Sequence, residues 1–311
     1  MTANILLTTS KVLTLDIDSN QKIDKPMASC SLKWRQQKLW VKKTKSNSAY
    51  VLPALIRPQW LQNCLKLSSV KQICIDPQLD EATIRLWANV GKKAKKQIFL
   101  RIHSCRKALY RQNNFSWRVK RALDWSAAAV LLLLASPVLL IIALLIKILT
   151  PGPIFFRQWR VGTRGRLFQI YKFRTMVVDA ERQHHQVMGG KTGLHKCEND
   201  PRVTPLGRWL RKYSLDELPQ LLNVLRGELS LVGPRPWALY DALRLGESSR
   251  ERLNALPGIT GAWQVAARSK ILELDAVTKY DLDYLHSWSL TKDLTILLMT
   301  LPQVLSGRGA Y

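Results

Sequence analysis

The chain has 311 residues, with 48 Lys and Arg against 22 Asp and Glu, and a formal net charge of +26 at pH 7. So large an excess predicts a polyanionic partner, which is a nucleic acid, an anionic membrane surface or a phosphorylated substrate. The five cysteines include no CxxC pair, which argues against a zinc knuckle or a disulfide framework.

The beginning of the chain is its most basic part. Residues 1–120 carry 23 Lys and Arg against 6 Asp and Glu, so their net charge is +17. Residues 1–49 show little periodic pattern. We expect them to be basic and weakly structured, with one strand near residues 11–15.

From residue 50 the pattern becomes regular. RPQWLQNCLKL and DEATIRLWANVGKKAKK have helical periodicity, and VKQICID and QIFLRIH are typical of short buried strands. Their alternation predicts a small α/β unit with a parallel strand pair, followed by a linker, over residues 50–115. The unit contains neither a GxGxxG nor a P-loop pattern, so it carries no nucleotide-binding fingerprint.

A run of 22 uncharged residues, WSAAAVLLLLASPVLLIIALLI, occupies residues 125–146. As a helix it is about 33 Å long, which is enough to cross a bilayer. Ser136 and Pro137 lie at its middle. Proline there predicts a sharp kink, with Ser136 as a partner for a freed backbone group. Basic residues flank both ends, which favours a re-entrant helix with both ends in the cytoplasm; a straight span is the alternative.

Two segments after the apolar run mix aromatic and basic residues. In PGPIFFRQWRVG, residues 151–162, the aromatics suit the headgroup level of a membrane, and Arg157 and Arg160 suit lipid phosphate. A simple membrane-proximal turn explains that segment equally well. In FQIYKFRTM, residues 168–176, aromatics alternate with Lys172 and Arg174, as on a strand with one basic face that suits a diphosphate.

The rest of the chain predicts a mostly helical domain. Helices are expected at residues 179–187, 205–212, 216–225, 239–245, 276–286 and 291–304. The apolar stripe of the last helix is expected to be core, with a helix lying on the membrane surface as the alternative. Its members are Leu294, Leu297, Leu298 and Leu301. The fold class is therefore α/β (α+β) and membrane-associated.

Two of the few acids, Asp216 and Glu217, stand side by side in SLDELPQLLNVLRGELSLVGPRP, residues 214–236. In the simplest interpretation Ser214 caps a helix and the acids favour its positive end. The alternative is phosphoryl chemistry, which needs cations, a carboxylate ligand for a hard metal, and a nucleophile or base. Arginines before the acids, and Arg235 between two prolines, supply such cations.

Residues from about 118 onward resemble the bacterial sugar transferases, the monotopic phosphoglycosyl transferases that make polyprenyl-diphosphate-linked sugars. The matching stretches are, in order, KRALD, the apolar run with its central SP, PGPIFFRQWRVG, YKFRTM, DPRVTPLGRWLRKYSLDELPQLLNVLRGELSLVGPRP, PGITGAWQV and DLDYLHSWSLTKDLTILL. The resemblance places a sugar transferase domain at residues 116–311, with its membrane helix at 125–146. Ala267 stands where family members commonly carry glycine, which bears on substrate preference more than on chemistry.

The resemblance implies that a phosphosugar passes from a UDP-sugar to polyprenyl (undecaprenyl) phosphate with release of UMP, which initiates assembly of an exopolysaccharide or another surface glycan. By position, Asp216 is the nucleophile that forms an acyl phosphate, and Glu217 binds the cofactor Mg²⁺. The residues that match the family's phosphate- and nucleotide-binding positions are Lys172, Arg174, Arg202, Arg208, Arg211 and Arg235. The enzyme is expected at the cytoplasmic face of the cell inner membrane.

Two other functions stay open. A membrane-anchored, metal-dependent glycosyltransferase that releases UDP needs a DxD pair, for which the candidates are Asp16/Asp18 and Asp281/Asp283. A membrane-anchored nucleic-acid-binding protein explains the charge, but the sequence shows no reading module. The expected partners are a UDP-sugar, polyprenyl phosphate and anionic membrane lipid; no nucleic acid is expected, and a homodimer stays open. The histidines at 184, 185 and 195 are expected in a polar loop rather than a metal site.

Overall fold

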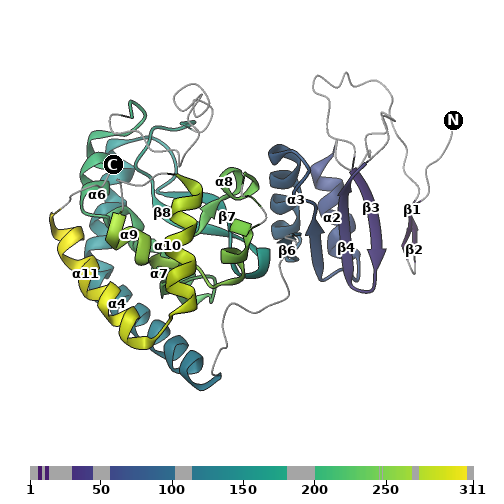
Figure 1. The fold of residues 1–311 in the computed structure, drawn as a ribbon. Coiled ribbons are helices and arrows are strands. Elements are labelled where there is room, and N and C mark those ends of the chain that lie inside the picture. The colour runs from purple at the N-terminus through teal and green to yellow at the C-terminus, as the bar shows by residue number, and fades with distance from the viewer. Residues whose placement is uncertain are drawn as a thin grey trace. The chain divides into compact units, whose positions relative to one another are not determined.

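The computed structural model describes residues 6–8, 11–13, 30–44, 57–101, 114–180, 200–244, 246, 248–267 and 273–306. The chain divides into two compact units, Met1–Arg101 and Ile102–Tyr311, called the N-terminal and C-terminal units here (Figure 1). Most of the helix predicted at 179–187, the three histidines of the polar loop and the first DxD candidate lie outside the described residues.

The N-terminal unit is built on a four-stranded sheet with the order β3-β4-β5-β6. β3 (Cys30–Arg35) and β4 (Lys38–Lys43) form an antiparallel hairpin, and β5 (Gln72–Ile75) and β6 (Gln97–Leu100) continue the sheet in parallel. The predicted parallel pair is confirmed. The expectation of weak structure up to residue 49 is wrong for residues 30–43. The many lysines of this segment obscure its strand pattern, in which burial alternates along β4 with a period of two residues.

Helices α2 (Pro58–Leu67) and α3 (Glu81–Lys93) cover one face of this sheet (Figure 1). That face is formed by buried aliphatic side chains, among them Val41, Ile73 and Ile98. Asp80 caps α3 by accepting a hydrogen bond from the Thr83 N–H at 2.9 Å. Near the beginning of the chain, β1 (Leu6–Thr8) and β2 (Lys11–Leu13) form a separate antiparallel pair, which includes the strand expected near residue 11.

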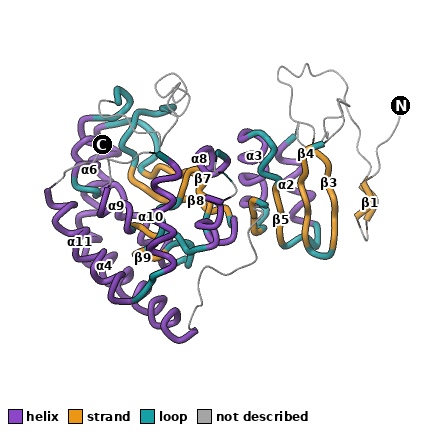
Figure 2. The backbone as a smooth tube through the Cα atoms, viewed as in Figure 1, coloured by secondary structure: helices purple, strands orange, loops and turns teal. Residues whose placement is uncertain are grey.

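The C-terminal unit combines small sheets with many short helices (Figure 2). β7 (Phe155–Val161) is antiparallel to both β8 (Leu167–Phe173) and β10 (Trp237–Ala238), and β9 (Ser230–Val232) is parallel to β11 (Gly258–Thr260). The helical segments after α4 are η1 (Thr163–Gly165), α6 (Pro205–Lys212), η2 (Leu215–Gln220), α7 (Leu221–Leu225), α8 (Leu239–Leu243), η3 (Ser248–Asn254), α9 (Ala262–Ala267), α10 (Leu274–His286) and α11 (Leu290–Ser306). The helices predicted at 205–212, 239–245, 276–286 and 291–304 are present, whereas the one predicted at 216–225 is a 3₁₀ segment, η2, followed by the short helix α7.

Helix α4 (Asn114–Leu149) contains the apolar run and is long and apolar enough to cross a membrane. Its helical residues continue through Pro137, so the proline does not divide the run into two helices. Pro137 has no N–H to donate to the carbonyl of Leu133, four residues earlier. The Ser136 hydroxyl donates to that carbonyl instead, at 2.8 Å, as the sequence analysis expected of this side chain.

Both halves of α4 pack against the C-terminal unit. In the first half, Ala128 and Leu132 contact a core cluster that includes Phe168 of β8. In the second half, Ile142 and Ile146 pack with Phe173, at the other end of β8, and with Leu210 of α6. The side chains of α4 that face away from these clusters are large, apolar and exposed; they include Leu133, Leu134, Leu140, Ile141, Leu144 and Ile148. The helix therefore presents one stripe to the protein and another to its surroundings.

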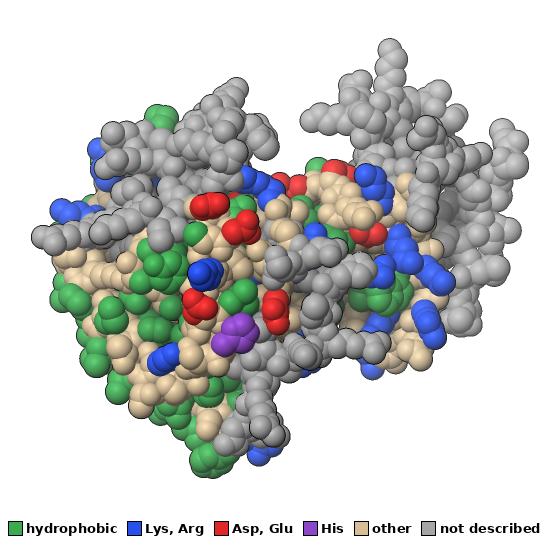
Figure 3. Space-filling view, viewed as in Figure 1, with side chains coloured by type: hydrophobic (Ala, Val, Ile, Leu, Met, Phe, Trp, Pro, Cys, Tyr) green, Lys and Arg blue, Asp and Glu red, His purple; other side chains and the backbone are tan. Residues whose placement is uncertain are grey.

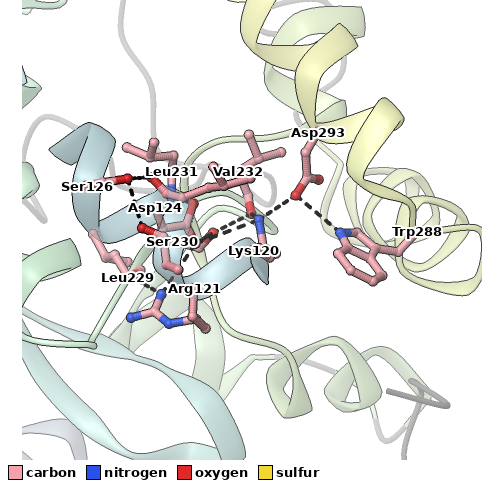
Figure 4. Close-up of polar contacts among 12 residues, drawn as sticks. Lys120, Arg121, Asp124, Ser126, Leu229, Ser230, Leu231, Val232, Trp288 and Asp293 are labelled. Carbon is pink, nitrogen blue, oxygen red and sulfur yellow. Dashed lines mark hydrogen bonds and ion pairs between the residues drawn. The ribbon is translucent and has the colours of Figure 1, made fainter. Parts of the chain in front are cut away.

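A buried polar network fixes the beginning of α4 (Figure 4). The Lys120 ammonium lies 2.5 Å from an Asp293 carboxylate oxygen and donates to the Val232 carbonyl at 3.1 Å. Asp124, one turn further, accepts from the Ser230 hydroxyl at 2.7 Å and from the Leu231 N–H at 3.2 Å. Charged groups are rarely buried unless they are paired in this way. The KRALD stretch thus joins the apolar helix to β9 and α11.

Helix α11 corrects one expectation. Leu294, Leu298 and Leu301 are each more than half exposed, so the prediction that this stripe is core is wrong for these three side chains. Ile296 is buried and Leu297 packs beside it against the core. The helix therefore has apolar side chains on both its inner and its outer face, and Figure 3 shows hydrophobic side chains over α11. The surface-lying alternative agrees with this exposure.

Candidate active site

The paired acids lie on η2, a short 3₁₀ segment between α6 and α7. Ser214, directly before it, has a left-handed backbone (φ 54°), and its side chain makes no capping hydrogen bond. The Glu217 N–H instead bonds the Ser214 carbonyl at 3.1 Å. The capping interpretation of SLDE is therefore wrong in its central contact. Asp216 is also buried, with 7% of its surface exposed, where an acid that only favours a helix end is normally solvated.

Two cations hold the second acid. The Lys172 ammonium, on β8, donates to Glu217 Oε1 at 2.6 Å. A guanidinium nitrogen of Arg235 lies 3.6 Å from the same oxygen. Residues 172, 217 and 235 are separated by at least 18 positions in the chain, yet the fold brings their charges to one point. Lys172 of YKFRTM and Arg235 of GPRP, both named in the sequence analysis as matching phosphate- or nucleotide-binding positions, therefore lie beside Glu217. Their role in substrate binding stays a prediction.

Burial and charge act in opposite directions on Asp216. The pKa of its carboxyl is raised from 3.8 to about 6, with burial as the largest cause and the neighbouring Glu217 charge as a further one. Lys172, Arg211 and Arg235 oppose this shift by favouring the carboxylate. The result is a poorly solvated carboxylate at neutral pH, surrounded by positive charge. Such an oxyanion is a stronger nucleophile toward phosphorus than a hydrated one.

The positive groups of the site are themselves desolvated. Burial lowers the pKa of the Lys172 ammonium, and the Glu217 and Asp216 charges counteract that shift. Burial likewise lowers the pKa of the Arg211 guanidinium, whose Nε donates to the Thr175 hydroxyl at 2.9 Å. Cations in a poorly hydrated site attract an incoming phosphate more strongly than cations in bulk water. The cluster is therefore suited to a substrate that carries several negative charges.

Three arginines that the sequence analysis predicted to bind phosphate either bond other groups or lie exposed on a helix. They are Arg174, Arg202 and Arg208. Arg174 donates to the carbonyls of Pro151 and Thr150 at 2.7 and 3.0 Å, and so holds the turn that leaves α4. Arg202 forms a buried two-bond pair with Asp200, at 2.8 and 2.6 Å. Arg208 is exposed on α6. Because Arg174 and Arg202 have carbonyl and carboxylate partners, their present contacts are structural.

Arg160 is a residue of the site that the sequence analysis assigned to lipid phosphate. Its guanidinium donates to the Pro236 carbonyl at 3.1 Å and to Gln158 at 2.7 Å. Burial lowers its pKa, and the charges that act on it include those of Arg235 and Glu217. No local signal distinguishes Arg160 from Arg157, which is exposed on the same strand. Arg160 reaches the GPRP turn because β7 pairs with β10, which directly follows that turn.

A second buried pair supports the Arg235 turn from behind. Arg252, on η3, donates through Nε to Asp281 at 3.0 Å and through Nη2 to the Arg235 carbonyl at 3.0 Å. Its guanidinium lies 4.2 Å from the centre of the Trp237 ring. Asp281 belongs to the second DxD candidate, and its carboxylate is buried in this pair. It is therefore not available as a metal ligand, which removes one feature that favoured a DxD glycosyltransferase.

Within the described residues, no group of three or more His, Cys, Asp and Glu side chains could hold a metal ion. Mg²⁺ does not require such a group, because it is commonly bound by one or two carboxylates together with substrate phosphates and water. The adjacent carboxylates of Asp216 and Glu217, with cations beside them that suit phosphate, match this donor set. The residues present therefore fit Mg²⁺ that arrives with, or is completed by, a phosphorylated substrate.

Comparison with known proteins matches this part of the chain. A family model described as bacterial sugar transferase matches residues 115–307. A galactosyl transferase of Streptococcus agalactiae, CpsE, is 43% identical over 194 residues, which are 61% of this chain and 43% of the relative. The exopolysaccharide production protein ExoY of Rhizobium meliloti is 42% identical over 200 residues, 62% of this chain and 88% of the relative. A UDP-glucose:undecaprenyl-phosphate glucose-1-phosphate transferase of Caulobacter vibrioides is 45% identical over 200 residues, 62% and 72% of the two chains. The chain thus spans less than half the length of the streptococcal relative and most of the other two.

Proposed function

Because this chain belongs to the bacterial sugar transferase family, we propose that it transfers a phosphosugar from a UDP-sugar to polyprenyl phosphate and releases UMP. The product is a polyprenyl-diphosphate sugar. Relatives named for exopolysaccharide production or for undecaprenyl-phosphate sugar transfer support a role in initiating surface glycan assembly. The observation that carries the chemistry is the buried Asp216 carboxylate beside Glu217, with Lys172, Arg211 and Arg235 acting on it.

The reaction has two displacement steps at one phosphorus atom. A carboxylate oxygen of Asp216 attacks the sugar-bearing phosphorus of the UDP-sugar, the bond from that phosphorus to the bridging oxygen breaks, and UMP leaves with the oxygen. An oxygen of polyprenyl phosphate then attacks the acyl phosphate, and the Asp216 carboxylate leaves. Lys172 and Arg235 offset the charge of the diphosphate during both steps.

Glu217 is the proposed Mg²⁺ ligand. When bound, Mg²⁺ supplies positive charge that stabilises the negative charge on the transferring phosphoryl group. Lys172 and Arg235 lie 2.6 and 3.6 Å from the same oxygen, Oε1, of Glu217. Replacing Glu217 with Gln is expected to reduce activity severely and to raise the Mg²⁺ concentration needed for half-maximal activity, which distinguishes a ligand from a purely structural acid.

The experiment that tests the function is covalent. Purified protein given a UDP-sugar without polyprenyl phosphate is expected to release UMP and to gain one phosphosugar on Asp216, detected by intact-mass and peptide mass spectrometry and removed by hydroxylamine. The Asp216→Asn variant is expected to gain nothing. Asp283→Asn, which changes an exposed acid of α10, is the matched control and keeps the adduct. Release of UDP instead of UMP would establish a glycosyltransferase.

We propose in addition that both ends of α4 face the cytoplasm at the inner membrane. Support comes from the packing of both halves of α4 on the same unit, since a helix that stood straight across a bilayer would carry part of that unit into the lipid. Cysteines placed at the exposed Arg118 and Arg157 are both expected to resist a membrane-impermeant reagent added to intact cells. Labelling of one position alone would show a span.

A further inference from the structure

The N-terminal unit has a second sheet face that α2 and α3 do not cover. In register across it, Lys33 of β3 pairs with Trp40 of β4, Trp40 with Cys74 of β5, and Cys74 with Phe99 of β6. Side chains two residues apart on a strand share a face. The same face therefore carries Arg35, Lys38 and Lys42, with Arg101 at the end of β6. These five cations and Trp40 are called the basic sheet face here.

Among the described residues, the charge on this face has one sign only. Strands β3 to β6 contain no acid. Among the described residues of the unit the acids are Asp76, Asp80 and Glu81, which lie in the turn before α3 and in its first turn. Figure 3 shows Lys and Arg side chains gathered over β3 and β4. An excess of positive charge on a surface attracts an anionic partner.

A shallow cavity of about 190 Å³ lies within the face, lined by Lys33, Arg35, Trp40, Lys42 and Arg101. The Arg101 guanidinium lies 5.6 Å from the centre of the Trp40 ring. Pockets that enclose a drug-sized ligand have volumes of about 300 Å³ or more. This cavity is below that size, so it suits a single phosphate-bearing group, such as a lipid headgroup, better than an enclosed nucleotide.

We propose that the basic sheet face docks on anionic membrane lipid, with a headgroup phosphate in the cavity. The inference rests on the proposed membrane placement of α4. Residues 102–113 separate this unit from α4, and a chain of that length spans at most about 45 Å. The unit is therefore held near the bilayer, where even weak charge attraction acts at high effective concentration. Trp40 adds a side chain of the kind that prefers the headgroup level.

The test uses the full chain in nanodiscs of phosphatidylcholine alone or with phosphatidylglycerol. An amine-reactive reagent modifies exposed lysines, and mass spectrometry gives the rate at each one. Lys33, Lys38 and Lys42 are expected to react several-fold more slowly on the anionic discs. Lys66 and Lys93, exposed on α2 and α3, are expected to react equally on both. Salt at 0.5 M is expected to abolish the difference, because it shortens the range of charge attraction.

Two variants sharpen the result. In Lys33→Gln/Lys42→Gln, Lys38 is expected to regain its neutral-disc rate on anionic discs; in the matched Lys66→Gln/Lys93→Gln variant its protection persists. Equal rates at Lys38 of the wild-type protein on both kinds of disc would overturn the proposal. So would protection by UDP or a short oligonucleotide on neutral discs without protection by lipid. Recovery of the protein in discs and its UMP release are measured on the same samples, so failure of the proposed function is recognised separately.

Discussion

Replacing Asp216 with Asn is expected to stabilise the fold while it abolishes turnover. The pKa of this carboxyl is raised from 3.8 to about 6, with burial as the largest cause. A carboxyl whose pKa is raised in the folded state binds its proton more tightly there than in the unfolded chain. Stability is therefore lost as pH rises from about 4 to 6, and the full loss persists above that range.

The magnitude follows from the shift. A rise in pKa from 3.8 to about 6 corresponds to about 3 kcal/mol at neutral pH. Asn has nearly the same shape and carries no charge, so Asp216→Asn removes this cost. For a domain of roughly 200 residues, 3 kcal/mol corresponds to an increase in Tm of roughly 6–12 °C. The attacking oxyanion is lost at the same time, and UMP release is expected to fall by several orders of magnitude.

Thermal unfolding of both proteins at pH 4, 5, 6, 7 and 8 measures the effect. The difference in Tm is expected to be near zero at pH 4, to grow up to about pH 6 and then to remain constant. Other titrating groups are common to both proteins and cancel in the difference. A variant that is less stable than the wild type at pH 7 would refute the reasoning, since the attraction of Lys172, Arg211 and Arg235 for the carboxylate would then outweigh its desolvation.

Three further outcomes are expected. The rate of UMP release should fall as pH drops through about 6, where Asp216 protonates. Lys172→Gln should move that fall to higher pH, because the Lys172 ammonium favours the Asp216 carboxylate. The pH–rate profiles of the wild type and the variant measure both effects. Asp281→Asn leaves the Arg252 guanidinium buried without its counter-charge and should cost about 3–5 kcal/mol of stability, measured by denaturant unfolding; a change below 1 kcal/mol would contradict the buried pair. Ser136→Ala leaves the Leu133 carbonyl without the hydroxyl that bonds it, and should lower the free energy of unfolding by about 0.5–1.5 kcal/mol, seen as a lower Tm. The control Ser126→Ala should cost less, because the Ala122 carbonyl that it bonds also has a backbone N–H partner in an ordinary helix.

The sequence alone determined most of the local elements and predicted a chemistry for the acids. Periodicity located the longer helices of the C-terminal unit and the strand and helix alternation at 57–101, because burial of one face imposes a period on the residues; it did not locate η3 or α9. The two acids within a basic stretch predicted phosphoryl chemistry as the alternative to a helix start, because that chemistry needs cations beside a carboxylate. The Ser-Pro pair predicted a backbone carbonyl that needs a new partner, since proline lacks an N–H in any fold.

Tertiary structure decided which cations belong to the acids. Lys172 and Arg174 are two residues apart with the same charge, yet Lys172 bonds Glu217 and Arg174 bonds the turn after α4. Arg160 reaches the site only because β10 pairs with β7, a contact between residues more than 70 positions apart. Helix α11 is apolar on both its inner and its outer face, so the sequence pattern could not show which face is buried. Pairing and exposure depend on which distant segments meet, and a local pattern carries no information about that choice.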